Sequence, residues 1–416
     1  MKLAAEIHAR PHEQLNAPVR ASHLAVIFGP EGVKDDFAHL TKLCDLFGLK
    51  PPNIEESHFA ASLGNLRLRW ERHTEFSTYT FYDFASFTDP FAQSAIDAVP
   101  DEWLAEMPGQ TMVALHLAID NKIRDDEEIG QLFHRNSLAG SRVMSGAGMV
   151  WSDFSVHDDG WSRMLLSDQG LTRGQTGRLF QRLTEIETYR MLALLGLPIA
   201  RTIGPALSRL DGGLSEVIEK LADKTSPNDG DRELLDRLTT QAAEAERLSA
   251  ASAYRFSASL AYAALVQRRI QELREERLPG LQTIAEFMDR RLAPAMATQS
   301  SIAIRQDALA LRIGRAGDLL RTRVDIALEE KNRDLLKSMD KRAQLQLRLQ
   351  ETVEGLSVVA ISYYLVGLVG YAVKGVKGAG FHIDPDLVVG LSVPFILGFV
   401  FIGLRRLRHI LSNSKT

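Results

Sequence analysis

Two uncharged runs near the C-terminal end constrain this chain more than any other feature. The first covers residues 355–373 and the second residues 387–404, and neither contains a charged side chain. A helix of about 20 apolar residues crosses the ~30 Å hydrocarbon layer of a bilayer. The short connection, residues 374–386, is rich in glycine and contains a proline, which is typical of a tight turn. The pattern predicts a transmembrane hairpin whose spans end at Gly355, Val373, Leu387 and Leu404.

The flanks of this hairpin predict its orientation. Arg342 and Arg348 precede the first run, and Arg405, Arg406 and Arg408 follow the second. Basic residues accumulate on the cytoplasmic side of a membrane. We therefore expect a multi-pass protein of the inner (cytoplasmic) membrane with both termini in the cytoplasm. A hairpin buried in the core of a soluble protein is the alternative, and it leaves the basic flanks unexplained.

The remaining composition limits the classes of function. Charged residues make up 25% of the 416 residues, as in an ordinary soluble protein, and the first residues lack the apolar core of a signal peptide. We therefore expect residues 1–350 to lie in the cytoplasm. A net charge of −4 gives no reason to expect nucleic acid as a partner. Cys44 is the single cysteine, which excludes an internal disulfide bond and a cysteine-based zinc cluster.

Strand signals are confined to the first part of the chain. Segments rich in β-branched and aromatic residues, with stretches of alternation, predict strands over residues 22–29, 65–84, 111–119 and 141–156. Between them, residues 35–49 and 89–107 have helical spacing, and a turn is predicted over residues 158–160. Strand signals stop after Gly170.

This change in pattern predicts three parts and a fold class that is α+β followed by α-helical. Residues 1–165 are expected to form a mixed α/β cytosolic domain. Residues 166–350 are expected to form a helical bundle and a stalk helix. Residues 351–416 contain the transmembrane hairpin and a basic cytosolic tail.

Glycine and proline separate the predicted helices of the middle part. A helix over residues 177–198 is expected to stop at Gly196 and Pro198. A second, alanine-rich helix runs towards Arg277. A third begins near Gln282 and continues into the first span.

The last of these helices carries an apolar stripe. No proline or glycine lies between Leu320 and Gly355, which predicts a stalk of ~50 Å at a rise of 1.5 Å per residue. A polar Asn within an apolar helix seam fixes register and oligomer number at a cost in stability. We expect a homo-oligomer through this stripe, and packing on the chain's own helices is the alternative. The predicted seam consists of Leu320, Val324, Leu328, Asn332, Leu335 and Met339.

Residues 67–75 form the most suggestive polar cluster. Read as one strand, this segment places Arg67, Arg69, Glu71, His73 and Glu75 on one face. His73 and Glu75 are candidate metal ligands and Glu71 is a candidate base. Charge pairs on a solvated sheet face give the same pattern and are the alternative.

Two smaller polar groups have weaker claims to a site. His8, Arg10 and His12 cluster near the start of the chain, and Glu187 and Arg190 are spaced to form an ion pair along a helix. The chain lacks the common nucleotide-binding and hydrolase motifs. The residues therefore assign no catalytic group, no cofactor and no reaction.

Several segments resemble a bacterial family of uncharacterised membrane-anchored proteins, classed as a domain of unknown function. They are residues 6–11, 69–81, 177–198 and 352–371. The likeness extends over nearly the whole chain. It implies a membrane anchor and brings no activity with it.

The order of the predicted parts is also similar to that of the CorA-type divalent-metal channels. Those channels are pentamers with a Gly-Met-Asn signature, preceded by an aromatic residue, at the outer end of the first span. Here Gly370 and Tyr371 are present, but Ala372, Val373 and Lys374 stand in place of the triplet. This departure puts transport of hydrated magnesium in doubt.

Two functions follow as expectations. The favoured one is a membrane-tethered cytosolic module that binds a partner or a small ligand, with a divalent cation as a candidate. The alternative is a CorA-like oligomeric channel or transporter. The first span offers polar side chains such as Ser357, Ser362, Tyr363 and Tyr364 but no acidic one, which is thin for a cation pathway.

Overall fold

The computed structural model describes residues 12–29, 32–223, 230–378 and 384–413. Contacts divide the chain into two compact units. Unit 1 comprises residues 1–226 and 232–318, and unit 2 comprises residues 227–231 and 319–416. The change from strands to helices near residue 165 therefore falls inside unit 1.

Within the described residues, nine strands of unit 1 form one mixed sheet in the order β2-β3-β4-β1-β5-β8-β7-β6-β9. Neighbouring strands are antiparallel except for β5 and β8, which are parallel. The strands are β1 (Val19–Ile27), β2 (His58–Leu63), β3 (Leu66–Arg72), β4 (Phe76–Asp83), β5 (Gln110–Asp120), β6 (Ala139–Val143), β7 (Gly148–Ser152), β8 (Ser162–Asp168) and β9 (Glu276–Arg277).

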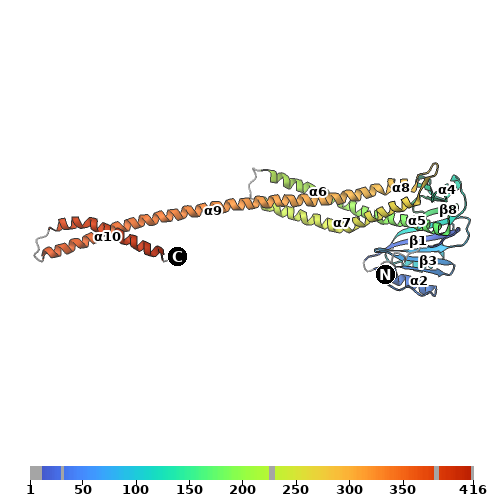
Figure 1. Cartoon of the computed structure of the whole chain (residues 1–416), viewed down its shortest axis with the longest axis horizontal. Coiled ribbons are helices and arrows are strands. Elements are labelled where there is room, and N and C mark those ends of the chain that lie inside the picture. The colour runs from blue at the N-terminus through green and yellow to red at the C-terminus, as the bar shows by residue number, and fades with distance from the viewer. Residues whose placement is uncertain (1–11, 30–31, 224–229, 379–383, 414–416) are drawn as a thin grey trace. The chain divides into compact units, whose positions relative to one another are not determined.

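Alternation along the strands separates two cores. Residues such as Ala21, Ala25 and Tyr82 face helix α5 (Arg173–Leu194) and form a large core with its apolar side chains. Residues of the other face pack with α2 (Gly32–Leu46) and the short helices η1 (Ala95–Ala98) and α3 (Asp101–Ala105). The sheet is thus covered by helices on both faces, because its strands carry apolar side chains on both (Figure 1).

The helical segments of unit 1 differ from the expected ones at several places. Residues 89–107 form only η1 and α3, because Pro100 interrupts them. The structure adds α4 (Asp126–Leu132), whose Asp125–Glu128 capping box is a recognisable start signal, and strand β2, which was not predicted.

The first of the expected helices ends within two residues of the predicted stop at Gly196, but no loop follows it. Helix α5 ends at Leu194, but α6 (Gly196–Ala222) follows at once. Pro198 lies in the first turn of α6, where its missing N–H is not needed. Gly196 instead permits close packing, because a Cβ there would overlap the amide of Gln299.

The later helices follow the expected order. Helix α7 (Asp231–Leu273) ends before the predicted break. The chain then forms strand β9, which was not predicted and which pairs with β6 at the edge of the sheet. Helices α8 (Ile284–Arg291) and α9 (Ala293–Gly378) come next, and α9 is continuous between Leu320 and Gly355 as predicted.

Unit 2 contains the end of α9 and helix α10 (Pro385–Asn413). Among the described residues, three helical segments are long and apolar enough to cross a membrane: Arg173–Ala222, Ile284–Val376 and Asp386–Gly403. Ile284–Val376 contains the first predicted span, and Asp386–Gly403 covers the second predicted span except for Leu404. The segment over α5 and α6 was not predicted. The share of buried residues in the most apolar part is 33% for α5–α6 and 6% for each of the others. The α5–α6 segment is thus the one that uses its apolar side chains most in the core of unit 1.

The contact between α5 and the segment before β1 generates a stability prediction. A Cβ at Gly177 would overlap the backbone carbonyl of Glu13, whereas at Gly174 its nearest neighbour is the mobile end of Arg178 at 3.3 Å. We expect Gly177→Ala to lower the free energy of unfolding by about 1–3 kcal/mol, because backbone cannot move aside as a side chain can. Gly174→Ala should leave it unchanged or raise it by up to ~1 kcal/mol through helix propensity.

Urea unfolding of the full chain in detergent measures both variants. Equal stability of the two alanine variants would contradict the close approach of residue 13 to helix α5.

Candidate ligand-binding cavity between the sheet and helix α5

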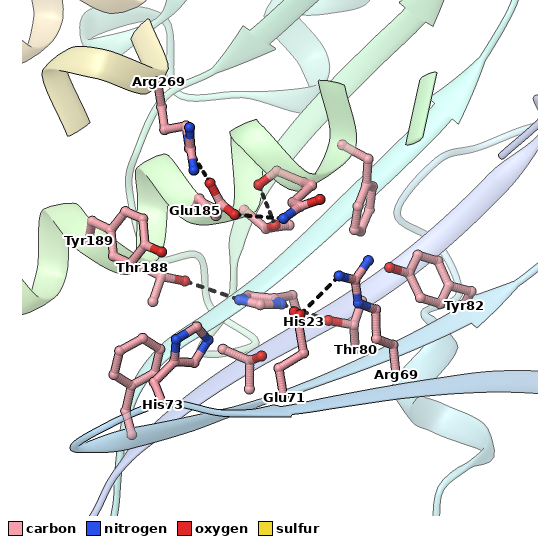
Figure 2. Close-up of a pocket in the computed structure, with 15 residues that line it drawn as sticks. His23, Arg69, Glu71, His73, Thr80, Tyr82, Glu185, Thr188, Tyr189 and Arg269 are labelled. Carbon is pink, nitrogen blue, oxygen red and sulfur yellow. Dashed lines mark hydrogen bonds and ion pairs between the residues drawn. The ribbon is translucent and has the colours of Figure 1, made fainter. Parts of the chain in front are cut away.

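A polar cavity of about 240 Å³ lies between one face of the sheet and helix α5. Strands β1, β3 and β4 supply one wall, and α5 with one residue of α7 supplies the other (Figure 2). Alternation explains the first wall, because every second residue of β4 points to this side. The lining consists of His23, Arg69, Glu71, His73, Phe76, Thr78, Thr80, Tyr82, Phe180, Gln181, Thr184, Glu185, Thr188, Tyr189 and Arg269.

His23 joins the two walls. Its Nδ1 lies 2.8 Å from Oγ1 of Thr80 in β4, and its Nε2 lies 3.1 Å from Oγ1 of Thr188 in α5 (Figure 2). Burial lowers the pKa of His23 to about 4, so the ring is neutral at neutral pH. A neutral imidazole has one N–H and one lone pair. One threonine hydroxyl therefore accepts a hydrogen bond and the other donates one, and both ring nitrogens are engaged.

An ion pair lies on the sheet side of the cavity. Arg69 donates to Glu71 over 2.9 Å, and the two side chains are only 5% and 15% exposed. Tyr82 lines the same wall, where burial raises the pKa of its hydroxyl and keeps it protonated. The phenol therefore offers a hydrogen-bond donor and acceptor at neutral pH.

A second ion pair lies on the helical side. Arg269 of α7 pairs with Glu185 of α5 (Figure 2). Gln181 donates to Glu185 over 2.8 Å. Arg269 also contacts Glu272 at 3.1 Å. The two arginines that line the cavity are thus matched by two glutamates that line it, and the lining has no net formal charge when its histidines are neutral.

The structure corrects the prediction of one strand over residues 67–75. Strand β3 ends at Arg72, and the N–H of His73 donates to the carbonyl of Phe76, so the chain turns between β3 and β4. The predicted face is correct for Arg67, Arg69 and Glu71, while the alternate residues of β3 pack in the core on the α2 side.

The turn separates the two candidate metal ligands. His73 stacks on Phe76, with ring centroids 4.2 Å apart, beside the cavity. Glu75 points to α7, where Arg255 donates to its oxygens over 3.1 and 2.8 Å and Tyr254 donates over 3.3 Å. His73 and Glu75 therefore contact different residues.

The other sequence candidates lie outside the cavity. Glu187 and Arg190 form the predicted pair, at 2.5 and 3.0 Å. His12 lies 3.4 Å from Arg178 at the start of α5. His8 and Arg10 lie outside the described residues.

The predicted membrane and seam residues lie in α9 and α10. Gly355 and Val373 are in α9, and Leu387 and Leu404 are in α10. On the predicted seam, Leu320 is buried and Val324 is half-buried. The remaining seam residues are exposed in the described chain: Leu328, Asn332, Leu335 and Met339.

Sequence reasoning missed the residues that complete the cavity. His23, Thr188, Glu185 and Arg269 come from three elements that are far apart in the chain. The one available signal was the polar pair Ser22–His23 inside a largely apolar strand. That signal does not say which residues face the histidine.

Comparison with known proteins identifies the family. A family model described as "Protein of unknown function (DUF3422)" matches residues 1–411, so the chain belongs to this family. The resemblance to a domain of unknown function is thereby confirmed. No curated protein matches the chain, and the similarity to CorA-type channels stays a prediction of layout.

The buried state of His23 predicts a pH dependence of stability. Its pKa of about 4 in the folded chain is below the ordinary histidine value of 6.5, so the unfolded chain binds the proton more tightly. The stability that the neutral, buried ring contributes is complete above pH 6.5 and is lost as the pH falls towards 4. Between pH 7 and pH 5, we expect the free energy of unfolding of the wild type to fall by about 2 kcal/mol more than that of His23→Asn.

Chemical unfolding at several pH values measures this difference. The two proteins are compared by the slope of their unfolding free energy against pH. A constant loss of stability from the missing hydrogen bonds does not change this slope. Parallel curves for the two proteins would show that His23 does not titrate in this way.

Proposed function

We propose that this member of the DUF3422 family is a membrane-anchored protein whose unit 1 binds a small polar ligand of no net charge. The observation that carries the proposal is the polar cavity beside His23. Ligand sites are concave and place a few polar groups precisely. The cavity of about 240 Å³ lies below the ~300–1,000 Å³ range of drug-sized sites, which favours a small metabolite.

The electrostatics of the lining support a net-neutral ligand. Arg69 and Arg269 are already paired with Glu71 and Glu185. A charged ligand would upset this balance in a poorly solvated space, at a substantial desolvation cost. Hydroxylated or zwitterionic molecules can instead use the hydroxyl groups on both walls, which are those of Thr78, Thr80, Tyr82, Thr184 and Thr188.

Anchoring at the inner membrane is the second part of the proposal. Residues 355–373 and 387–404 would span, with the connection outside and both termini in the cytoplasm. The exposed apolar side chains of α9 and α10 support this assignment, because contiguous apolar surface of this extent is rare in proteins dissolved in water. Pro394 within α10 is compatible with a membrane helix.

Self-association through α9 belongs to the same proposal. Leu328, Leu335 and Met339 are each more than half exposed, and Asn332 lies among them. A second copy of the helix would cover this stripe and offer the same Asn as a partner. The CorA-like channel rests on layout alone, so binding is the function we favour.

A thermal-shift screen of the full chain in detergent tests the ligand class. The panel contains sugars and polyols, zwitterionic amino acids, and the anions phosphate and succinate. We expect a member of the neutral groups to raise the melting temperature, since a ligand at about 100 times its Kd adds ~2.7 kcal/mol. The anions should give no shift. A shift with the anions alone would overturn the assignment.

A matched pair of substitutions locates the effect. Thr184 lines the cavity, and its hydroxyl donates to the carbonyl of Gln181 within its own helix. Thr184→Met should fill the cavity and abolish the shift while both hydrogen bonds of His23 remain. Thr239→Met is the control, because Thr239 makes the same kind of intrahelical bond on an exposed face of α7. Binding that survives Thr184→Met would place the ligand elsewhere.

Reporter fusions test the anchor. A reporter inserted after His382 and one fused after Thr416 should report opposite compartments, with the second in the cytoplasm, because the basic flanks lie outside the two spans. The same compartment for both fusions would exclude the hairpin and leave the proposed ligand site untouched.

A further inference from the structure

Three potential metal ligands meet at the connection between β7 and β8. They are His134, Asp153 and His157, and one donor atom from each lies within 4.8 Å of the other two. None of them lines the cavity beside His23. We propose that these three residues bind a divalent transition-metal ion such as Zn²⁺.

The backbone places the three side chains from separate segments. Asp153 follows directly on β7, and His157 lies in the turn to β8, where its N–H donates to the carbonyl of Trp161 over 2.9 Å. His134 precedes the short helix η2 (Arg135–Ser137). The turn over residues 158–160 that the sequence predicted is present, and it holds His157 near Asp153.

The carboxylate of Asp153 is oriented before any ion binds. Its side chain is fully buried, and it accepts hydrogen bonds from the N–H of His134 over 2.8 Å and of Ser155 over 3.1 Å. Each carboxylate oxygen keeps a further lone pair. Backbone partners of this kind fix the direction of a metal-binding carboxylate.

His157 points at this carboxylate without forming a hydrogen bond of normal geometry. Its side chain is nine-tenths buried, and its Nε2 lies 3.0 Å from Oδ2 of Asp153. Even so, this nitrogen has no hydrogen-bond partner of acceptable direction. Two donors at 3.0 Å match the ~3.3 Å that separates two ligands of a tetrahedral zinc ion with bonds of ~2.0–2.1 Å.

His134 completes the set from the surface. Its ring stacks on that of His157 with centroids 4.6 Å apart and planes at 19°. His134 is exposed, so its side chain can rotate freely. A shift of its ring nitrogen by about an ångström brings the third donor to bonding distance. Arg163 and Asp159 are two further charged residues that act on His157, and they are paired with each other at 2.8 Å.

The donor types decide the class of ion. Two imidazoles and one carboxylate suit Zn²⁺ and similar transition metals, whereas Mg²⁺ and Ca²⁺ prefer sets made of oxygen atoms. Three protein ligands leave a fourth position of a tetrahedral ion for water or for a substrate. The exposed side of His134 gives that position access to solvent.

Zinc binding by the full chain tests the proposal. The protein is purified without a histidine tag, stripped with EDTA and dialysed against ZnSO4, and bound zinc is measured by mass spectrometry. We expect one equivalent of zinc in the wild type, and a loss of affinity of about tenfold or more in His134→Ala. His134 is exposed, so this variant should keep the melting temperature of the metal-free wild type.

Two further samples make the result specific. The double variant His8→Gln/His12→Gln should keep its zinc, because the N-terminal histidines are the competing candidates. Mg²⁺ in excess should not displace the zinc. No bound zinc in the wild type, or equal binding by His134→Ala and the wild type, would overturn the proposal.

Discussion

The hydrogen bonds of His23 hold a polar space open inside an apolar core. Around it, strands β1 and β5 pack directly on α5 through side chains such as Ala21, Leu115 and Leu183. At His23 the sheet and the helix meet instead through an imidazole between two threonine hydroxyls. Burial keeps the ring neutral, so it donates to one hydroxyl and accepts from the other. The cavity and its polar lining depend on this link.

The ion pairs around the cavity contribute little net stability. A buried ion pair roughly offsets its own desolvation, so Arg69–Glu71 and Arg269–Glu185 are weak arguments for a stable fold. Their effect is to leave the lining neutral while offering both signs of charge. A polar ligand of no net charge disturbs the charge balance of such a lining least. The electrostatics of unit 1 therefore support the proposed binding function.

The β7–β8 connection supports a different chemistry within the same unit. The cavity uses hydroxyls and balanced ions, whereas Asp153 and His157 present a buried carboxylate beside an imidazole. Phe154, between them, has a φ of 53°, a left-handed conformation that costs a non-glycine residue energy. Its ring stacks on Phe287 of α8 at 4.5 Å, and this packing helps to hold the segment that carries the proposed metal ligands.

Local patterns in the sequence determined the elements whose signal lies within a single segment. The apolar C-terminal runs, the unbroken helix α9, the turn after His157 and the alternation over Leu66–Glu71 all follow from neighbouring residues. The tertiary structure decided the rest: β3 ends at Arg72, and Glu75 pairs with Arg255, which is 180 residues away. His23 likewise meets Thr188 across 165 residues. Such contacts depend on the order of strands in the sheet and on which helix covers each face, and no periodicity within one segment contains that information.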